Sequence, residues 1–359
     1  MRVYYGDPAK LAAPRPALSS QLLELVGERY GLCVDSPRDL GGSFNLNVLV
    51  DGHVLRVYGP WVSAERLQEL QRIRRVLRSR GAPIPGLRPA ADGSPWGAWG
   101  DCVFEVESYM AGAPMDSWER LSTGMRALGR LHSLMADLDV RVPPPIANHL
   151  PQEIALAATL DATAIIRSWG PTAQEERYAE CAETLARMLP VTPLPCQLVH
   201  GDFWDNNVLF HDSELDRIQD GTRTVLGRRG AAGVCSSHPG FGLAAVLDLD
   251  FAGVRPRIDD LALPLGYCVL DAGARPADVR GLVDAYDAGC TTPLSDGERR
   301  ALPFAMARMA LSFLQYLVLP GDAAYLAGRR QELNEKRGPA CAWWLDALRD
   351  GALEEGTFA

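Results

Sequence analysis

The sequence lacks any run of 18 or more apolar residues, and its eight cysteines include no Cys-x-x-Cys pair. A membrane-spanning helix needs about 20 mostly apolar residues, so none is predicted. The first seven residues, MRVYYGD, do not have the pattern of a signal peptide. Scattered cysteines without metal-type spacing are predicted to be reduced and mostly buried thiols. These absences favour a soluble cytoplasmic protein that does not bind a membrane.

Positive charge is also in short supply, because the net charge is −9. This balance argues against a nucleic-acid partner. Residues 1–108 hold 13 Lys+Arg and 12 Asp+Glu, so the negative excess lies in the remainder of the chain. That excess favours a cationic small-molecule partner, and an ordinary solvated surface would also produce it. The sequence leaves the oligomeric state unknown.

The most informative motif is His200-Gly201-Asp202 with Asn207 five positions after the acid, set between short apolar runs. In phosphoryl transfer an Asp takes the proton of the acceptor hydroxyl, while an Asn and a second Asp hold Mg²⁺. Asp202 and Asn207 fit the first two roles. Asp248, in the apolar segment 245–251, is placed to fill the third. His-Gly-Asp alone also suits a tight turn, so the hypothesis depends on the spacing and on the second acidic segment.

These motifs, continued by Gly253, Pro256, Arg257 and Asp260-Leu261-Ala262, resemble the aminoglycoside phosphotransferase and type II homoserine kinase superfamily. The resemblance implies an α+β, bilobal protein-kinase-like fold. Its N-terminal lobe, residues 1–108, would hold an antiparallel sheet and a helix and bind nucleotide. Its mainly helical C-terminal lobe, residues 109–359, would bind the acceptor. ATP and Mg²⁺ are the implied cofactors, GTP stays open as the donor, and an antibiotic is one acceptor that relatives modify.

Residues 40–50 and 53–58 are predicted to form two strands joined by a tight turn at Asp51-Gly52. Glycines at the head of such a hairpin allow backbone N–H groups to approach a phosphate. Gly41, Gly42 and Ser43 are therefore candidate nucleotide-binding residues, although Gly-Gly alone is often merely a turn.

Arg56 lies on the second of these strands, where the family places a basic residue against the nucleotide phosphates. The family often has Lys there. Arg keeps the charge and adds a planar fork. The helix predicted over residues 63–80 carries Glu65 and Glu69, and Glu69 is favoured as the partner of Arg56. The alternative that both acids are solvated stays open.

Residues 102–110 are predicted to form an apolar strand that leads into a hinge at 111–114. The resemblance implies that backbone groups here bind adenine, which singles out Glu107 to Tyr109 for their position. The alternative is an ordinary edge strand. Further amphipathic patterns predict helices at 20–30, 121–138 and within 152–189, and around 306–314 and 343–345. His132, inside one of them, is predicted to be a packing residue.

Two acids compete for the metal in the segment that ends the catalytic motif. If residues 245–251 form a strand, alternation puts Asp248 and Asp250 on the same face. Asp248 is preferred because it precedes Asp260 by twelve residues, the spacing that the family shows, and Asp250 is a candidate second ligand. The resemblance makes Asp260 a buried acid that braces the catalytic loop.

The family usually joins the two catalytic strands by a tight hairpin, whereas this chain has a long insertion at residues 211–243. A connection of this length is either functional or disordered. Two other functions remain: a protein-serine kinase and a non-catalytic nucleotide-binding module. The absence of His-Arg-Asp, Asp-Phe-Gly and Ala-Pro-Glu motifs argues against the first, and the intact Asp202, Asn207 and Asp248 argue against the second.

Overall fold

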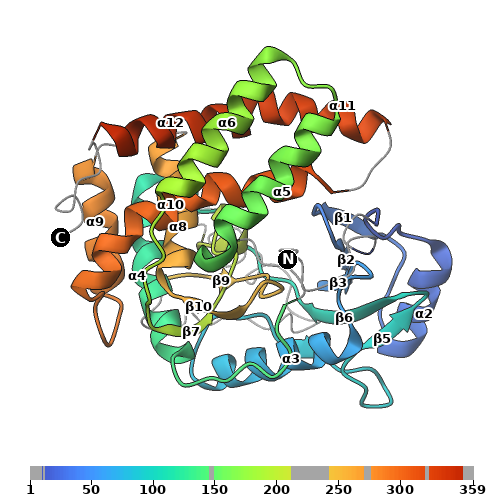
Figure 1. Cartoon of the computed structure of the whole chain (residues 1–359). Helices are drawn as coiled ribbons and strands as arrows, with labels where there is room; N and C mark the ends of the chain where they lie inside the picture. The colour runs from blue at the N-terminus through green and yellow to red at the C-terminus, as the bar shows by residue number, and fades with distance from the viewer. Residues whose placement is uncertain are drawn as a thin grey trace. The chain divides into compact units, whose positions relative to one another are not determined.

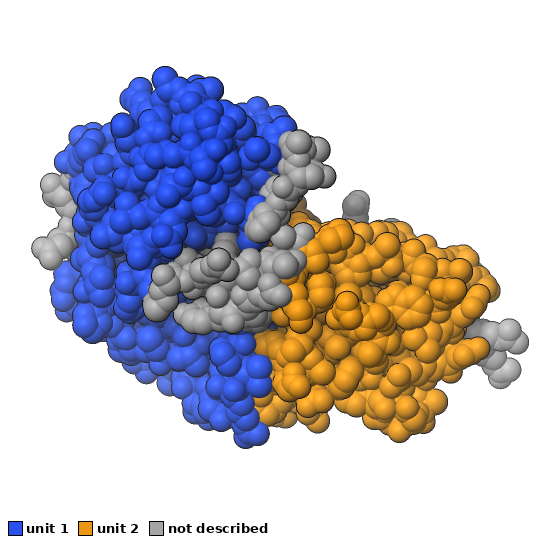
Figure 2. All heavy atoms as spheres, turned by 45° about the vertical axis from the view of Figure 1, so that its right-hand side comes forward, with its two compact units in different colours: residues 1–8, 128–204, 249–359 blue, residues 9–127, 205–248 orange. Residues whose placement is uncertain are grey.

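The computed structural model describes residues 10, 13–144, 149–211, 242–270, 276–319 and 323–350. The chain forms two compact units (Figure 2). Unit 1 comprises residues 1–8, 128–204 and 249–359, and unit 2 comprises residues 9–127 and 205–248. The chain passes between the units inside helix α4 (Trp118–Met135). The functional boundary predicted after residue 108 stays a prediction.

Unit 2 contains an antiparallel sheet whose neighbouring strands follow the order β1 (Arg38–Gly41), β2 (Leu46–Val50), β3 (His53–Val57), β6 (Cys102–Ser108) and β4 (Leu87–Arg88), with β5 (Gly97–Trp99) also paired to β6. Asp51 and Gly52 both have positive φ, as a two-residue hairpin turn requires. The prediction of one continuous strand over residues 40–50 is wrong. Gly41 and Gly42, with φ of 85° and 117°, turn the chain so that β1 pairs back onto β2.

Two helices of unit 2 begin where their sequences predict. The Ser19 hydroxyl accepts a hydrogen bond from the Leu22 N–H at the start of α2 (Ser20–Tyr30), and the Ser63 hydroxyl accepts one from the Arg66 N–H at the start of α3 (Ala64–Ser79). α2 packs on the sheet face that carries Leu55 and Phe104. Because successive strand residues point to opposite faces, Arg56, Glu105 and Glu107 lie on the other face.

Unit 1 is mainly helical (Figure 1). In it α8 packs against α10, and α6 packs against both α5 and α12. The helices predicted from amphipathic patterns are therefore confirmed. A two-stranded sheet, β7 with β10, precedes α8 along the chain. The bounds are η1 (Gln152–Ile154), α5 (Ala155–Ser168), α6 (Ala173–Met188), β7 (Cys196–Val199), β10 (Gly253–Pro256), α8 (Ile258–Leu270), α9 (Pro276–Asp287), α10 (Asp296–Leu317), α11 (Ala323–Glu332), the π-helix η3 (Leu333–Arg337) and α12 (Gly338–Arg349).

A short ladder in unit 2 connects β8 (Val208–Leu209), which follows η2 (Asp205–Asn207), with β9 (Ala245–Val246). The strand predicted over residues 245–251 is too long, since β9 ends at Val246 and Asp248 has a left-handed backbone with φ of 56°. Strand alternation therefore does not relate Asp248 to Asp250. The predicted insertion begins just after β8, and its residues 212–241 lie outside the described residues.

In the part of the chain that the structure describes, no helix is long and apolar enough to cross a membrane. The described cysteines are all free, but only Cys268 and Cys341 are buried. The prediction of mostly buried thiols is wrong, because Cys33 and Cys196 are exposed and the others are partly exposed. The antiparallel sheet and the helical unit together confirm the predicted α+β class.

Candidate active site

The loop that carries Asp202 is held in unit 1 by the carboxylate of Asp260. The backbone N–H groups of His200 and Gly201 each donate to Asp260 over 2.7 Å. His132 contacts the same carboxylate through Nε2 at 3.0 Å, and its Nδ1 lies 2.8 Å from the Tyr286 hydroxyl. Burial would raise the pKa of Asp260, but the hydrogen bond with His132 and nearby positive charge outweigh it and lower that pKa. The predicted bracing role of Asp260 is confirmed, and His132 belongs to the same network.

Gly201 allows the loop to make its turn beside Asp202. Its φ of 86° is in the left-handed region, and a Cβ there would overlap the carbonyl oxygen of Phe251 and the guanidinium of Arg255. Arg255 itself donates to that carbonyl. Conformation and space both require glycine at this position.

Replacing Gly201 by Ala is expected to destabilise the protein by more than the roughly 1–3 kcal/mol of a strained backbone residue, because steric overlap adds to the strain. Gly31→Ala is the matched control, since Gly31 has φ of 62° but a methyl group there would meet no atom within 4 Å. Denaturant unfolding of both variants measures the difference. Equal losses of unfolding free energy would contradict the crowding around Gly201.

Asn207 and Asp248 lie at the same end of the β8–β9 ladder in unit 2. Asn207 directly precedes β8, and its carbonyl accepts a 2.8 Å hydrogen bond from the N–H of Leu247, the neighbour of Asp248. Arg56 of β3 forms an ion pair with Asp248, with Nη2 and Oδ1 2.7 Å apart. Asn207 is thus joined through its backbone to the neighbour of Asp248, and the Asp248 carboxylate contacts the Arg56 guanidinium, all within unit 2. This combination of oxygen ligands and positive charge suits a metal-bound polyphosphate.

The oxygen donors of Asn207 and Asp248 are of the type that Mg²⁺ prefers, and Mg²⁺ is usually held by one or two protein carboxylates while water and phosphate complete its coordination. Among the described residues, no three His, Cys, Asp or Glu side chains gather as an all-protein metal site. The residues present therefore fit a metal that arrives with a nucleotide. Asp250, the second predicted ligand, belongs to unit 1 and is only 3% exposed.

Three acids of unit 2, Glu69, Glu105 and Glu107, form ion pairs with arginines of α3. Glu69 is paired with Arg72, with Oε2 and Nε 2.9 Å apart, and the predicted pairing of Arg56 with Glu69 stays a prediction. Arg74 of α3, which the sequence did not single out, binds both Glu105 and Glu107. Burial alone would lower the pKa of Arg74, but the two carboxylates outweigh it and raise that pKa. The alternation of two acids in an otherwise apolar strand was a signal for this buried ionic layer.

The remaining predicted nucleotide residues lie at exposed turns or at the end of β6. Gly41 ends β1, and Gly42 and Ser43 follow it before β2; all three are exposed, as a phosphate-binding loop requires. The Glu107 side chain is buried, whereas Tyr109 is 38% exposed. The N–H groups of Ser108 and Tyr109 donate to the carbonyls of Gly86 and Gly52. Adenine contacts at this segment would therefore use carbonyl oxygens or residues after Tyr109.

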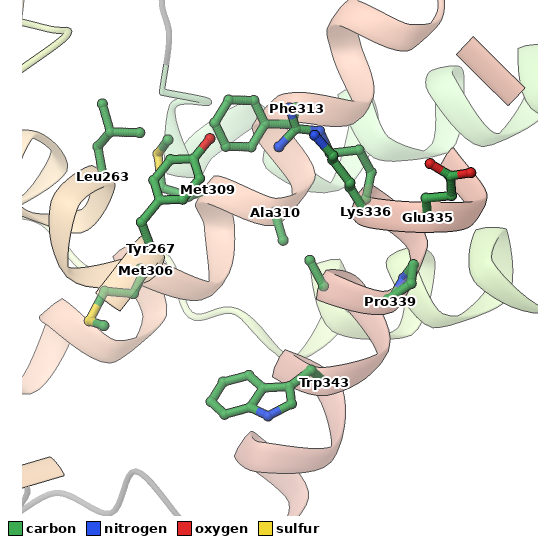
Figure 3. Close-up of a pocket in the computed structure, with 13 residues that line it drawn as sticks. Leu263, Tyr267, Met306, Met309, Ala310, Phe313, Glu335, Lys336, Pro339 and Trp343 are labelled. Atoms are coloured by element: carbon green, nitrogen blue, oxygen red, sulfur yellow. The ribbon is translucent and has the colours of Figure 1, made fainter. Parts of the chain in front are cut away.

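A cavity of about 410 Å³ opens within unit 1 among α8, α10, η3 and α12 (Figure 3). Tyr267 and Phe313 line one side of it, and Trp343 lies on the other. Tyr267 stacks on Trp204, with ring centroids 4.3 Å apart. Trp204 is two residues after Asp202, so an aromatic contact connects the Asp202 loop with the cavity wall. Sequence analysis predicted a helical acceptor lobe but not these lining residues.

A sheet unit with the Arg56 and Asp248 pair and a helical unit with a braced Asp202 loop define the protein-kinase-like fold. The model of the Phosphotransferase enzyme family matches residues 38–218, half of the chain. The chain therefore belongs to the phosphotransferase enzyme family, and it is a small-molecule kinase that acts on a hydroxyl group. No curated protein matches it.

Solved structures support the same fold. The chain is similar to the microcompartment-associated aminopropanol kinase, with 17% identity, a TM-score of 0.66 and coverage of 94% of this chain and 100% of the other. For an amicoumacin kinase in complex with AMP-PNP, Ca²⁺ and Ami the values are 14%, 0.60, 93% and 94%. For a spectinomycin phosphotransferase in complex with ADP and spectinomycin they are 13%, 0.52, 95% and 99%.

Proposed function

We propose that the protein transfers the γ-phosphoryl group of ATP to a hydroxyl of a small molecule, with Asp202 as the base. The observation that carries this proposal is the convergence of Asn207, Asp248 and Arg56 at the end of the β8–β9 ladder. Asp202 is five residues from Asn207, and a chain of that length spans at most about 18 Å. The base is therefore tethered near the phosphate-binding residues.

In this mechanism the Asp202 carboxylate orients the acceptor hydroxyl and accepts its proton. The acceptor oxygen forms a bond to the γ-phosphorus, the bond from that phosphorus to the bridging oxygen breaks, and ADP leaves with the electron pair. Asn207 and Asp248 would hold Mg²⁺, which neutralises charge on the phosphates when bound. Arg56 exchanges its ion pair with Asp248 for contact with the nucleotide, and Gly42 and Ser43 offer backbone N–H groups to phosphate oxygens, since the Gly41 N–H already donates to Asp39.

Turnover of ATP with Mg²⁺ and a panel of hydroxyl compounds, with mass detection of the phosphorylated product, tests this function. The panel should include aminopropanol, amicoumacin and spectinomycin, the small molecules named for structural relatives. GTP in place of ATP distinguishes the donor. Phosphorylation of a protein substrate alone would favour a protein kinase. Nucleotide binding without any transfer would favour a non-catalytic module.

Asp248→Asn is expected to weaken binding of Mg²⁺–ATP by about tenfold or more, because a charged metal ligand is lost. Asp250→Asn, the matched acid two residues later, should change it much less, because Asp250 is 3% exposed while the Asp248 side chain is 25% exposed and adjoins Arg56. Calorimetry with and without Mg²⁺ measures both variants. Loss of metal dependence in Asp250→Asn alone would reverse the assignment of the two acids.

A further inference from the structure

The cavity of unit 1 has walls that suit an apolar body. Met306 and Phe313 of α10, Tyr267 of α8 and Trp343 of α12 contribute thioether and aromatic surface to it. Trp343 is 42% exposed although it is among the largest apolar side chains of the molecule. Pockets of roughly 300–1,000 Å³ with mainly apolar walls are typical small-molecule sites. The cavity at about 410 Å³ is within this range.

A series of contacts connects this cavity with the catalytic loop. Trp204 stacks on Tyr267, and Tyr267 meets Phe313 edge-on with centroids 6.2 Å apart. The guanidinium of Arg337 then lies 4.0 Å from the Phe313 ring centroid. The ring of Tyr267 therefore lies between a molecule along this wall and Trp204, which is two residues after Asp202.

A rare element supplies the charged side of the cavity. Glu335, Lys336 and Arg337 all belong to the π-helix η3. π-Helical residues make up well under 1% of globular proteins, and π-bulges occur frequently at functional sites. Here the element places three charged residues at the cavity: Glu335 and Lys336 (Figure 3), and Arg337, whose guanidinium lies on the Phe313 ring. The position of this rare element at the wall of the cavity is a second feature that points to a ligand.

The charged residues that line the cavity are two cations, Lys336 and Arg337, and one acid, Glu335. Arg337 forms an ion pair with Glu332, with Nη2 and Oε1 2.9 Å apart. Glu335 accepts a hydrogen bond from Gln331. Lys336 is exposed, and no carboxylate of the described residues forms an ion pair with it. Lys336 and Lys10 are the two lysines in a sequence with 36 Lys+Arg. A compact ammonium group therefore stands at the cavity in a chain that otherwise uses arginine.

The lining residues of the cavity do not share the negative excess of residues 109–359, because they include one acid, Glu335, beside two cations, Lys336 and Arg337. Several other acids pair with arginines elsewhere in unit 1. These pairs are Glu175 with Arg330, Glu183 with Arg167, Asp259 with Arg308, Asp287 with Arg299 and Glu298 with Arg257. The overall charge of the sequence favoured a cationic acceptor. The local charge of the cavity favours the opposite sign.

We propose that the acceptor is a hydroxy acid with an apolar, preferably aromatic, body, whose carboxylate is received by Lys336. This inference rests on the proposed kinase function and specifies its substrate class. The body lies against Tyr267, Phe313 and Trp343, while the hydroxyl is directed toward Asp202. A polycationic amino sugar fits poorly, because its ammonium groups would be desolvated against apolar walls with Glu335 as the one lining carboxylate.

Selective labelling of lysine tests the binding site without turnover. An amine-reactive reagent is applied to the full chain, and labelling of Lys336 and Lys10 is followed by mass spectrometry. 3-Phenyllactate should slow labelling of Lys336 and leave Lys10, the internal control, unchanged. 1-Amino-3-phenyl-2-propanol, which has the same body with an ammonium group, should protect Lys336 less. Equal labelling of Lys336 with and without millimolar 3-phenyllactate overturns the proposal.

Steady-state kinetics with four probes distinguishes the contribution of the apolar body from that of the charged group. The probes are 3-phenyllactate, lactate, 1-amino-3-phenyl-2-propanol and 1-amino-2-propanol. The aryl carboxylate should have the highest kcat/KM. Lys336→Gln should raise its KM by about tenfold with little change in kcat, and Lys10→Gln should not. Trp343→Ala should raise the KM of the two phenyl compounds by about fivefold and leave the KM of lactate and 1-amino-2-propanol unchanged.

Faster turnover of either amine or of spectinomycin contradicts the proposed acceptor class but not the kinase function. Protection of Lys336 without phosphorylation of any probe supports the site and contradicts the kinase function.

Discussion

The Asp202→Asn variant is expected to lose roughly 10²–10⁴-fold in kcat, the usual contribution of a positioned proton acceptor. The amide keeps the shape of the side chain but cannot take the proton of the acceptor hydroxyl. Affinity for Mg²⁺–ATP should hold, because Asn207 and Asp248 remain to bind it. Steady-state kinetics and calorimetry on the same preparation measure the two effects separately.

Asp205→Asn is the control for this experiment, because Asp205 lies in the same loop. Within the described residues, its carboxylate accepts one hydrogen bond, from the N–H of its neighbour Asn206. Its kcat should change far less than that of Asp202→Asn. If both variants lose turnover to the same extent, the loop geometry and not the base is responsible. If Asp202→Asn retains full turnover, another group takes the proton.

Removal of the Asp260 carboxylate is expected to cost about 3–5 kcal/mol of unfolding free energy at neutral pH, as is usual when one partner of a buried charged network is deleted. Asp260→Ala leaves the buried N–H groups of His200 and Gly201 without their acceptor. It also removes the partner of His132. Denaturant unfolding should show a lower midpoint, and the kcat of the folded fraction should fall because the Asp202 loop loses its brace.

Asp296→Ala is a matched control for Asp260→Ala. Both acids are in the first turn of a helix, but Asp296 is exposed at the start of α10. Its loss should cost no more than about 1 kcal/mol, the usual limit for an exposed charge near a helix terminus. Comparable losses in the two variants would mean that the helix dipole, and not the loop, accounts for the effect of Asp260.

Sequence reasoning succeeded where the signal is local. Regular apolar spacing predicted helices over residues 20–30 and 63–80, and the structure has α2 and α3 there, with Ser19 and Ser63 as their N-caps. The Asp51-Gly52 turn has one favoured backbone geometry, so the β2–β3 hairpin was predictable. The role of Asp260 came from the family resemblance, and the hydrogen bonds to the loop confirm it.

Sequence reasoning failed where the backbone conformation interrupts an apolar pattern that is typical of a strand. Residues 40–50 and 245–251 both suggested continuous strands, but left-handed residues interrupt them at Gly41, Gly42 and Asp248. A left-handed aspartate is uncommon and costs conformational energy, so no propensity would indicate it in advance.

The buried ionic layer and the cavity depend on tertiary structure. Arg74 meets Glu105 and Glu107 because α3 lies over the sheet face that those acids share. Trp204, Tyr267 and Phe313 come from three segments that are distant in sequence, and the π-helix η3 has no distinct sequence pattern. Helical periodicity predicted these segments but not which of their residues would face a common space.

The β8–β9 ladder has a consequence for how the family can diversify. The Leu209 carbonyl accepts from the Ala244 N–H, and the Asn207 carbonyl accepts from the Leu247 N–H, each over 2.8 Å. These bonds fix the two ends of the segment 211–243, so its length is decoupled from the spacing of Asn207 and Asp248. Because each doubling of a flexible loop adds only about 0.6 kcal/mol, this junction tolerates growth thermodynamically. It is a place where a lineage, or an engineer who inserts a reporter domain, can add sequence without disturbing Asn207 and Asp248.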